Sequence, residues 1–474
     1  MRLNELYDCP YDVEIKGIKM NSKEVVPGDL FICTKGVTAD RHDYVEDAIH
    51  HGAVAIVASR KIDVSVPVIY VEDTNRELPH LCSKFYRNPQ DQLALVGITG
   101  TNGKTTVAML IQDLLGSDIC GYVGTNGIKC HAFQESIRNT TPDVDRMIPY
   151  LRRFADSGCK IVSMETSSEA FFRKRLDLFR FQVSVLTNIT QDHLNIHKTL
   201  ENYIDCKCEL FRKTKKDGFC ILNRDDEHFE TVRSCCSGKV LTYGTSEQAD
   251  LRILKMKSLV DGTDITFQFQ EETYDVHSPL IGEFNVYNLM AAFLVGYCFQ
   301  LSMHDLIARI DRISMIPGRM ELLKFGQPYQ IILDYAHTPD ALQKILSYLD
   351  KVKKGRLITV TGSAGGREQE KRGLMGKLVL DFSDHVIFTM DDPRNEDVNT
   401  IIDDLISLSD KKNYERIINR EEAIFHALDL AKENDIVLIA GKGRDNYMAY
   451  RDLYLPYCDY DEVKKYFDTK KALF

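Results

Sequence analysis

A glycine-rich stretch between two apolar segments constrains the fold of this chain more than any other feature. Residues 97–106 read GITGTNGKTT, with the strand-like run LALV (93–96) before them and the helix-like run VAML (107–110) after them. A loop between a strand and a helix turns backbone N–H groups and the helix N-terminus toward a bound phosphate. Lys104 is expected to reach the terminal phosphates, and a threonine hydroxyl to bind Mg²⁺. The pattern predicts a phosphate-binding loop on a central parallel sheet of the P-loop ATPase type.

The loop departs from the strict phosphate-binding pattern at one position. The usual motif has a glycine five residues before Gly103, where this chain has Ile98. We interpret the stretch as a shortened variant from Gly100 to Thr105. An ordinary Gly/Asn turn is the alternative, and the Gly-Lys-Thr sequence between strand and helix argues against it.

Length and charge narrow the functional classes. A chain of 474 residues is long enough for about three domains. The formal net charge of −10 argues against general nucleic-acid binding, because such binding needs a basic surface. The opening residues MRLNELYDCPYD do not resemble a signal peptide, and no apolar run approaches the roughly 18 residues of a membrane span. We expect a cytoplasmic protein that binds neither nucleic acid nor membrane.

Thirteen cysteines are scattered without regular spacing. The closest pairs are Cys206 with Cys208 and Cys235 with Cys236, and neither has the spacing of a zinc site. We interpret all thirteen as reduced thiols.

Residues 1–90 predict a small α/β domain. Strands are expected at 30–33, 53–57 and 66–71, and a helix at 44–51. The sequence Asn88-Pro89-Gln90 marks the boundary of this domain.

Residues 91–318 form the predicted central domain, and two of its strands end in polar residues. The run 160–164 ends at Glu165, and the run 183–186 leads to Asp192 and His193. Ligand-binding groups gather at the carboxyl ends of parallel strands, so these side chains should converge with the phosphate loop. The alternatives are an exposed strand-end acid for Glu165 and a capping or packed imidazole for His193. Later in the domain, the simplest interpretation of Asn285 and Asn288 is helix capping.

Residues 319–474 alternate four strands with helices, which predicts a dinucleotide-fold-like third domain. The strands are expected at 330–333, 356–360, 385–389 and 435–439. The loops after them carry Arg367, Arg372, Arg394 and Lys442. Cations on such loops suit the capture of carboxylates and phosphates, and a solvated charged rim is the alternative.

Six motifs in order make the chain resemble the Mur ligase family, the ATP-dependent amino-acid-adding enzymes of peptidoglycan synthesis and cell wall biogenesis. They are TGTNGKTT, NITQDHLNIH followed by YIDCKCELF, FNVYNLMAA, PGRME, DYAHTPDAL and AGKG. Within the family the chain is most similar to the subgroup that adds the third, usually dibasic, residue. The stretches NSKEVVPGDLF, NTTPD and DDPRNED carry that similarity.

The resemblance implies a role for each set of site residues. The ATP-binding set is Gly100, Thr101, Asn102, Gly103, Lys104, Thr105, Thr106, Asn285, Asn288, Arg319 and Asp334. The catalytic set is Lys104, Glu165, His193 and Lys207, and the metal ligands are Thr105, Glu165, His193 and Lys207. The set for the UDP-muramoyl-dipeptide is Met20, Ser22, Asn139, Thr140, Thr141, Ser167, Arg173 and Arg175. The amino-acid set is Arg367, Asp391, Asp392, Pro393, Arg394, Gly441 and Asp445.

Lys207 has its role from the resemblance alone. It matches the lysine that the family carboxylates with CO₂, in the pattern Tyr203-x-x-x-Lys207-x-x-x-Phe211. A carbamate would turn this cation into an anion that can coordinate a hard metal ion. Without the resemblance, Lys207 would be an ordinary lysine on a helix surface.

The implied reaction is amide ligation through an acyl phosphate. ATP phosphorylates the terminal carboxylate of UDP-N-acetylmuramoyl-L-Ala-D-Glu, and the amine of a diamino acid displaces phosphate. We favour meso-diaminopimelate over L-lysine because Arg394 could clamp a distal carboxylate. Asp392 stands where the diaminopimelate pattern has Asn, and its added charge favours the bare ammonium of lysine. Arg444 and Asp445 likewise replace the usual His and Glu.

Two further departures lie beside the expected dipeptide site: Glu169 where His is common, and Arg173 where Gln is common. They leave room for a divergent paralogue with an altered substrate. A non-catalytic paralogue that binds the precursor or a partner enzyme is a separate alternative, and the presence of Lys104, Glu165, His193 and Lys207 argues against it. The remaining alternatives are a folylpolyglutamate synthetase-like ligase and a simple P-loop ATPase or kinase. The first domain and the NTTPD stretch argue against the folate ligase. The motif around Lys207 and the two flanking domains argue against a simple ATPase or kinase. We expect a monomer.

Overall fold

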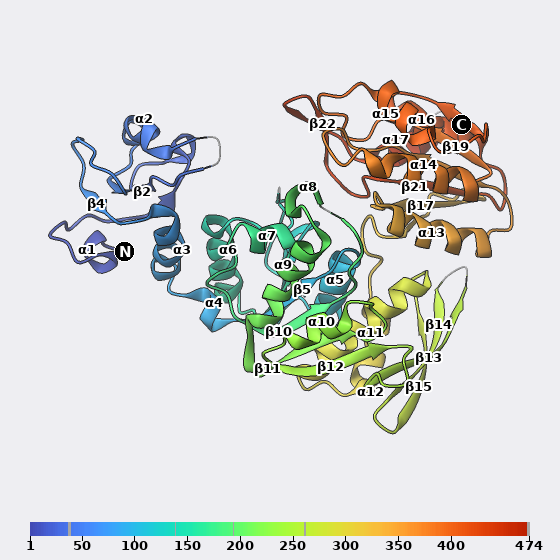
Figure 1. The fold of residues 1–474 in the computed structure, drawn as a ribbon, viewed down its shortest axis with the longest axis horizontal. Coiled ribbons are helices and arrows are strands. Elements are labelled where there is room, and N and C mark those ends of the chain that lie inside the picture. Colours follow the sequence, from blue (N-terminus) through green and yellow to red (C-terminus); the bar gives the residue numbers. More distant parts are fainter. Residues whose placement is uncertain (37–38, 138, 193, 260–261, 472–474) are drawn as a thin grey trace.

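The computed structural model describes residues 1–36, 39–137, 139–192, 194–259 and 262–471. It contains three α/β regions in chain order, each with its own main sheet, and the central region lies between the other two (Figure 1). This arrangement confirms the predicted fold class. Within the described ranges, no helix is long and apolar enough to cross a membrane.

The first region contains a four-stranded parallel sheet in the order β1-β2-β3-β4. Its strands are β1 (Gly17–Lys19), β2 (Asp29–Ile32), β3 (Ala55–Ala58) and β4 (Val68–Tyr70). Its helices are α1 (Leu3–Leu6), η1 (Ser22–Glu24), η2 (Arg41–Tyr44), α2 (Val45–His50), α3 (Thr74–Phe85) and α4 (Pro89–Gln92). The three predicted strands appear within two residues of their expected bounds.

The central sheet has eleven strands in the order β15-β14-β13-β12-β11-β10-β5-β9-β6-β7-β8. Its strands on the phosphate-loop side are β5 (Ala94–Thr99), β6 (Cys120–Gly124), β7 (Gly127–Lys129), β8 (Gln134–Glu135), β9 (Ile161–Glu165) and β10 (Phe181–Leu186). The others are β11 (Thr214–Asn223), β12 (Lys239–Gly244), β13 (Leu251–Ser258), β14 (Thr263–Phe269) and β15 (Glu272–Ser278). Strand β5 lies between β9 and β10 and runs parallel to both, so the residues after these three strands share one sheet edge.

Helices cover both faces of the central sheet. They are α5 (Lys104–Leu115), α6 (Val144–Asp156), α7 (Ser168–Phe172), α8 (Leu194–His197), α9 (Leu200–Arg212), α10 (Phe229–Ser234), α11 (Glu283–Cys298), α12 (Met303–Ile307) and η3 (Ile310–Arg312). Helices α5 and α11 are apolar nearly all round and are buried against one face, which holds the phosphate loop on a rigid base. Helix α11 begins at Glu283 with Gly282 as its N-cap, so the predicted capping role of Asn285 and Asn288 is wrong.

The third region contains a six-stranded sheet in the order β16-β17-β21-β18-β19-β20. Its strands are β16 (Glu321–Leu323), β17 (Gln330–Asp334), β18 (Leu357–Thr361), β19 (His385–Phe388), β20 (Tyr414–Arg416) and β21 (Ile436–Ala440), with a hairpin of β22 (Tyr447–Tyr450) and β23 (Leu453–Pro456). Its helices are α13 (Pro339–Val352), α14 (Glu370–Phe382), α15 (Val398–Ile406), α16 (Arg420–Leu430) and α17 (Asp459–Lys471). The four strands predicted here all occur, and they are parallel to one another.

We propose residues 1–90, 91–318 and 319–474 as the three domains. Residue 90 falls within the short helix α4, and residue 318 falls between η3 and β16. Each proposed domain contains one of the three main sheets.

Candidate functional site

The phosphate loop follows β5 and ends at the first residue of α5. Gly103 is the N-cap of this helix and has a left-handed φ of 85°. A Cβ atom at Gly103 would lie 2.5 Å from Oδ1 of Asn288, and a Cβ atom at Gly100 would overlap the hydroxyl of Thr187. Both positions therefore need glycine, since the loop packs directly against α11 and the end of β10.

Two lysines meet at the start of this loop. Nζ of Lys104 donates to the carbonyl oxygens of Gly100 (2.8 Å) and Thr101 (2.9 Å). Nζ of Lys207, from α9, donates to the same Gly100 oxygen at 2.8 Å and lies 4.3 Å from the ring centre of Tyr203. Burial, together with the charge of Lys104, lowers the pKa of Lys207 well below its ordinary value. Lys207 is 1% exposed, so the expectation of a lysine on the helix surface is wrong.

Glu165 is held by several donors at the end of β9. Its Oε1 accepts from the Tyr122 hydroxyl and the Thr125 N–H, both at 2.8 Å, and its Oε2 accepts from the Thr105 hydroxyl at 3.0 Å. Glu165 is 1% exposed, so the alternative of an exposed strand-end acid is wrong. A carboxylate and a hydroxyl so close together are hard oxygen donors of the kind that Mg²⁺ prefers.

The expected convergence of strand ends is present for the residues that can be described. Glu165 after β9, Asp192 after β10 and the loop after β5 all line one cavity. His193 lies outside the described residues. This edge of the sheet therefore gathers two carboxylates, two lysines and a threonine hydroxyl.

A cavity of about 680 Å³ opens on one side of the phosphate loop, between α11 and α13. Its walls include Asn102, Gly103, Thr106, Asn285, Asn288, Arg319 and Asp334, all of them predicted ATP-binding residues. Arg319 donates to the Thr105 hydroxyl at 3.0 Å and lies over the ring of Tyr335, so it spans the junction of the second and third domains. The Asp334 carboxylate accepts from the N–H groups of Met320 and Ala336, which fixes the chain on both sides of the junction.

A second cavity, of about 340 Å³, lies on the other side of the loop and is lined by the second and third domains. The central domain contributes Thr101, Asn102, Gly103, Lys104, Thr105, Asn139, Thr140, Thr141, Glu165, Ser167, Arg175, Asp192 and Lys207. The third domain contributes Arg367, Asp391, Asp392, Arg394, Gly441 and Asp445. Met20, Ser22, Arg173 and Pro393 are outside this lining, and the first two belong to the first domain.

The predicted dipeptide-binding residues form a small network at the end of β9. The Thr141 hydroxyl donates to the carbonyl oxygen of Glu165 (2.9 Å), and Ser167 caps α7. Nε of Arg175 pairs with Asp143 at 2.5 Å. Glu169 and Arg173, the two departures in this region, form an ion pair of 2.7 Å with each other along α7. Each of these two residues is therefore the ion-pair partner of the other.

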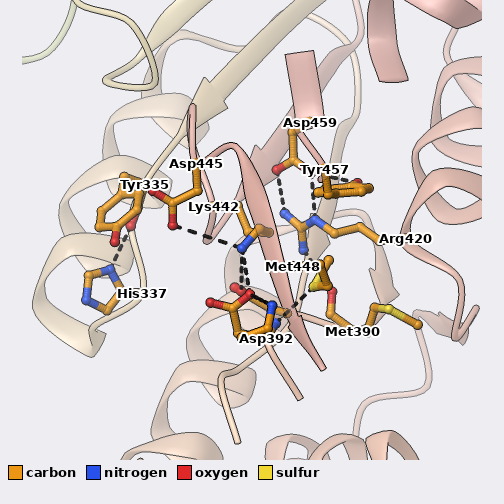
Figure 2. A network of polar contacts seen from close by, with 12 residues as sticks. Tyr335, His337, Met390, Asp392, Arg420, Lys442, Asp445, Met448, Tyr457 and Asp459 are labelled. Carbon is orange, nitrogen blue, oxygen red and sulfur yellow. Dashed lines mark hydrogen bonds and ion pairs between the residues drawn. The ribbon is translucent and has the colours of Figure 1, made fainter. Parts of the chain in front are cut away.

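The predicted amino-acid loops contain a buried charge cluster (Figure 2). Nζ of Lys442 lies 2.8 Å from Asp392 and 4.0 Å from Asp391 and from Asp445. Oδ1 of Asp392 also accepts from the Ala449 N–H at 2.9 Å. The negative charge that Asp392 adds to the family pattern is thus balanced within the protein by Lys442. Burial raises the pKa of Asp445 to about 7, while Lys442 opposes this rise.

A second buried pair holds the ends of β19 and β21 together. The Arg420 guanidinium donates to both oxygens of Asp459, at 2.8 and 2.7 Å, and to the carbonyl oxygen of Ala440 at 3.0 Å. Both side chains are fully buried, and Figure 2 shows the guanidinium beside the carboxylate. Ala440 directly precedes Gly441, so this pair positions the loop that carries Lys442 and Asp445.

The four predicted loop cations divide into two groups. Arg367 and Arg394 line the second cavity, and Nη1 of Arg394 donates to the carbonyl oxygen of Gly365 at 2.7 Å. Arg372 and Lys442 are buried in ion pairs, Arg372 with Glu396 and Asp404. The alternative of a solvated rim is therefore wrong for these two. The Arg444 guanidinium pairs with the Glu321 carboxylate through two nitrogens, with its Nε at 2.8 Å. This pair ties Arg444 to the domain junction.

Several site residues were not singled out from the sequence. Tyr335 and His337 line both cavities, and Thr125 and Lys371 line the second. Burial lowers the pKa of His337 to about 4, and the ring Nδ1 donates to the Tyr335 carbonyl oxygen at 2.8 Å. Both residues are in the DYAHTPDAL motif, which was the available signal.

Comparison with known families covers most of the chain. The profile of the Mur ligase middle domain matches residues 98–296. That of the Mur ligase glutamate ligase domain matches 318–443, and that of the Mur ligase family catalytic domain matches 14–95.

Curated relatives match along almost their full length. A UDP-N-acetylmuramoyl-L-alanyl-D-glutamate–2,6-diaminopimelate ligase from Bacillus cereus is 38% identical, over 94% of each chain. Proteins of the same name from Aquifex aeolicus and Listeria monocytogenes are 37% and 34% identical; the first match covers 95% of this chain and 93% of the relative, and the second covers both chains fully.

Solved structures agree with this result. A structure of a ligase of the same name is 29% identical, covers 99% of both chains and has a TM-score of 0.67. A folylpolyglutamate synthase from Mycobacterium tuberculosis, 16% identical, covers 77% of this chain and 91% of its own with a TM-score of 0.64, which shows a shared fold alone.

Proposed function

The chain belongs to the Mur ligase family, and from this premise we propose that it is an ATP-dependent amide ligase. It joins meso-diaminopimelate to UDP-N-acetylmuramoyl-L-Ala-D-Glu in the cytoplasm, as a step of peptidoglycan precursor synthesis. The curated relatives carry that activity in their names and match this chain over nearly its full length. Neither a folate ligase nor a silent paralogue is favoured by these names.

One observation carries the proposal. The second cavity brings the phosphate loop, Glu165 and Lys207 to face the loops of Arg394 and Asp445. An acyl phosphate made on one wall would meet an amine held by the other wall without leaving the cavity. Such positioning is the main contribution that a ligase makes to a bimolecular step.

The first cavity suits the adenosine part of ATP, since it joins the second at the phosphate loop through Asn102 and Gly103. Lys104 now donates to its own loop and would turn to the terminal phosphates. The γ-phosphoryl group moves to the D-Glu carboxylate oxygen, and ADP leaves. Thr141, Ser167 and Arg175 would hold that carboxylate near the loop, next to Glu165.

Magnesium fits the oxygen donors present beside the loop. Thr105 and Glu165 would hold it, and it would neutralise the negative charge of the phosphates. We propose that Lys207 completes this set as a carbamate. Formation of a carbamate requires a neutral amine, and the burial of Lys207 favours that form. The carbamate would be an anion close to the phosphate loop.

The amine step uses the third domain. The nitrogen of the diamino acid attacks the carbonyl carbon, phosphate leaves, and the amine loses a proton. Arg394 is exposed to the cavity and is the residue that would pair with the distal carboxylate of diaminopimelate. Since Asp392 is paired with Lys442, its charge does not favour lysine.

The decisive experiment is phosphate release from ATP with the UDP-dipeptide, with meso-diaminopimelate and L-lysine in parallel. Release with diaminopimelate alone is expected. Release with lysine alone would keep the ligase and overturn the role of Arg394. Absence of release with both, but turnover with folate, would favour a folate ligase; absence with all three would favour a silent paralogue.

A further inference from the structure

Two neighbouring residues, a cysteine and a histidine, lie together with a cysteine from further along the chain, at one side of the central sheet. The possible ligand atoms of Cys130, His131 and Cys159 are all within 4.8 Å of one another. Cys130 and His131 follow β7, and Cys159 lies between α6 and β9. None of the three lines the two cavities of the proposed active site.

Backbone hydrogen bonds hold all three residues in place. The Cys130 N–H donates to Phe133 at 2.9 Å, and the Cys159 N–H donates to Phe154 at 3.0 Å. The His131 N–H donates to the carbonyl oxygen of Ser117 at 3.0 Å, in the turn that follows α5. The cluster therefore lies where three segments of chain meet: the turn after α5, the residues after β7 and the residues before β9.

The histidine has a hydrogen-bond partner of the kind that supports a metal-binding histidine. Its ring Nδ1 lies 3.2 Å from the carbonyl oxygen of Ser117, which can only accept a hydrogen bond. This contact places the proton on Nδ1 and leaves Nε2 with a free lone pair. A ring N–H donated to a backbone carbonyl is the usual outer support of a ligating histidine.

The two thiols are protected, while the histidine opens to solvent. Cys130 is 5% exposed and Cys159 is 2% exposed. Burial, and after it the neighbouring Cys130 thiol, raises the pKa of Cys159 to about 12. A bound cation would displace the proton of this thiol, because a metal ion binds the thiolate. His131 is exposed, so a metal ion can enter from water.

We propose that Cys130, His131 and Cys159 form a binding site for Zn²⁺. Two thiolates and one imidazole are ligands that zinc accepts, and three protein ligands leave a fourth tetrahedral position for water. The ion would clamp the segment after β7 to the start of β9 and to the turn after α5. Since that segment leads through β8 to Asn139–Thr141, the site would brace one wall of the second cavity from a distance.

Cobalt substitution on the reduced full-length protein tests the proposal. A saturable thiolate-to-cobalt absorption band at one Co²⁺ per chain is expected, and Zn²⁺ should abolish it. Cys130→Ser, Cys159→Ser and His131→Gln should each weaken Co²⁺ binding at least tenfold. His131 is exposed, so its variant keeps the fold intact. Zn²⁺ should also raise the Tm of the wild type and leave that of Cys130→Ser unchanged.

Control variants distinguish this site from the other thiols. Cys235→Ser/Cys236→Ser removes the only adjacent cysteine pair and should keep the full band. The proposal is overturned if the wild type gives no saturable band, or if the band survives in Cys130→Ser and disappears in the control. It is also overturned if the reduced protein takes up no Co²⁺ and mild oxidation joins Cys130 to Cys159.

Discussion

The amines of Lys104 and Lys207 share a single acceptor, the carbonyl oxygen of Gly100, each at 2.8 Å. Two ammonium groups that share one oxygen repel each other, and burial lowers the pKa of both lysines. Lys207, which is more deeply buried, is the one expected to be neutral. The fraction of neutral amine rises with pH through this lowered pKa. A neutral amine is the form that reacts with CO₂, and this is the basis on which we propose Lys207 as the site of the carbamate.

Lys207→Ala should reduce ligation at least about 100-fold, since it removes the proposed carbamate ligand. Phosphate release measures this loss. Removal of dissolved CO₂ should lower the activity of the wild type, and bicarbonate should restore it. In the presence of ¹³C-bicarbonate, the wild type should give a carbamate NMR signal that the variant lacks.

The matched control for Lys207 is Lys213→Ala, which changes the C-cap lysine of the same helix. It should keep its activity and its CO₂ dependence. Full ligation by Lys207→Ala would remove the carbamate from the mechanism.

Arg394→Ala should reduce kcat/KM for meso-diaminopimelate about 100-fold, because a bidentate pair with the distal carboxylate is lost. Use of L-lysine, which has no such carboxylate, should fall less than about tenfold. Arg451→Ala, a neighbouring arginine outside the cavity lining, serves as the control. Equal losses with both amino acids would mean that Arg394 does not recognise this carboxylate.

Asp392→Asn restores the usual residue of the family pattern but removes the nearest partner of Lys442. We expect destabilisation near the lower end of the roughly 3–5 kcal/mol that breaking a buried pair costs. Asp391 and Asp445, at 4.0 Å, limit the loss. Urea unfolding measures the change. An unchanged unfolding midpoint in Asp392→Asn would contradict the pairing.

Asp445→Asn should make stability less dependent on pH. The pKa of Asp445 is raised from 3.8 to about 7, mainly by burial. The folded protein therefore keeps a proton that the unfolded chain releases, and this contribution to stability is lost as pH rises from about 4 to about 7. At about 1.4 kcal/mol per pKa unit, the variant should gain up to a few kcal/mol relative to the wild type at pH 7.5. Parallel curves of unfolding free energy against pH for the two proteins would refute this.

The Glu169–Arg173 pair predicts non-additive effects on binding of the UDP-dipeptide. Arg173→Gln alone leaves an unpaired carboxylate near Ser167 and should raise KM for the anionic substrate. Glu169→His/Arg173→Gln, which restores the common family residues, should bring KM back. Because the pair is half exposed, stability should change by no more than about 1 kcal/mol in either variant. Additive changes in KM would show that the two residues act separately.

Local sequence was sufficient for the elements and for the phosphate loop. The alternation of apolar runs with glycine-rich turns predicted some strands of each sheet, because period and turn residues are properties of neighbouring positions. In the central sheet it predicted β5, β9 and β10 but none of the other eight strands. Gly100 to Thr106 could be recognised for the same reason. The order of six motifs then pointed to the family, which the comparisons confirm.

Only the tertiary structure decided the state of the charged side chains. Lys207 looked like a surface residue because its burial depends on a loop more than a hundred positions away. Asp392 looked like an added charge in the pocket because Lys442, its partner, is fifty residues further on. Cys130 and Cys159 are separated by a helix and part of a sheet, so no local spacing could reveal them. Sequence sets which groups a chain contains and the segments that carry them. Packing sets the distance between groups and their exposure to water, and these two quantities decide charge and chemistry.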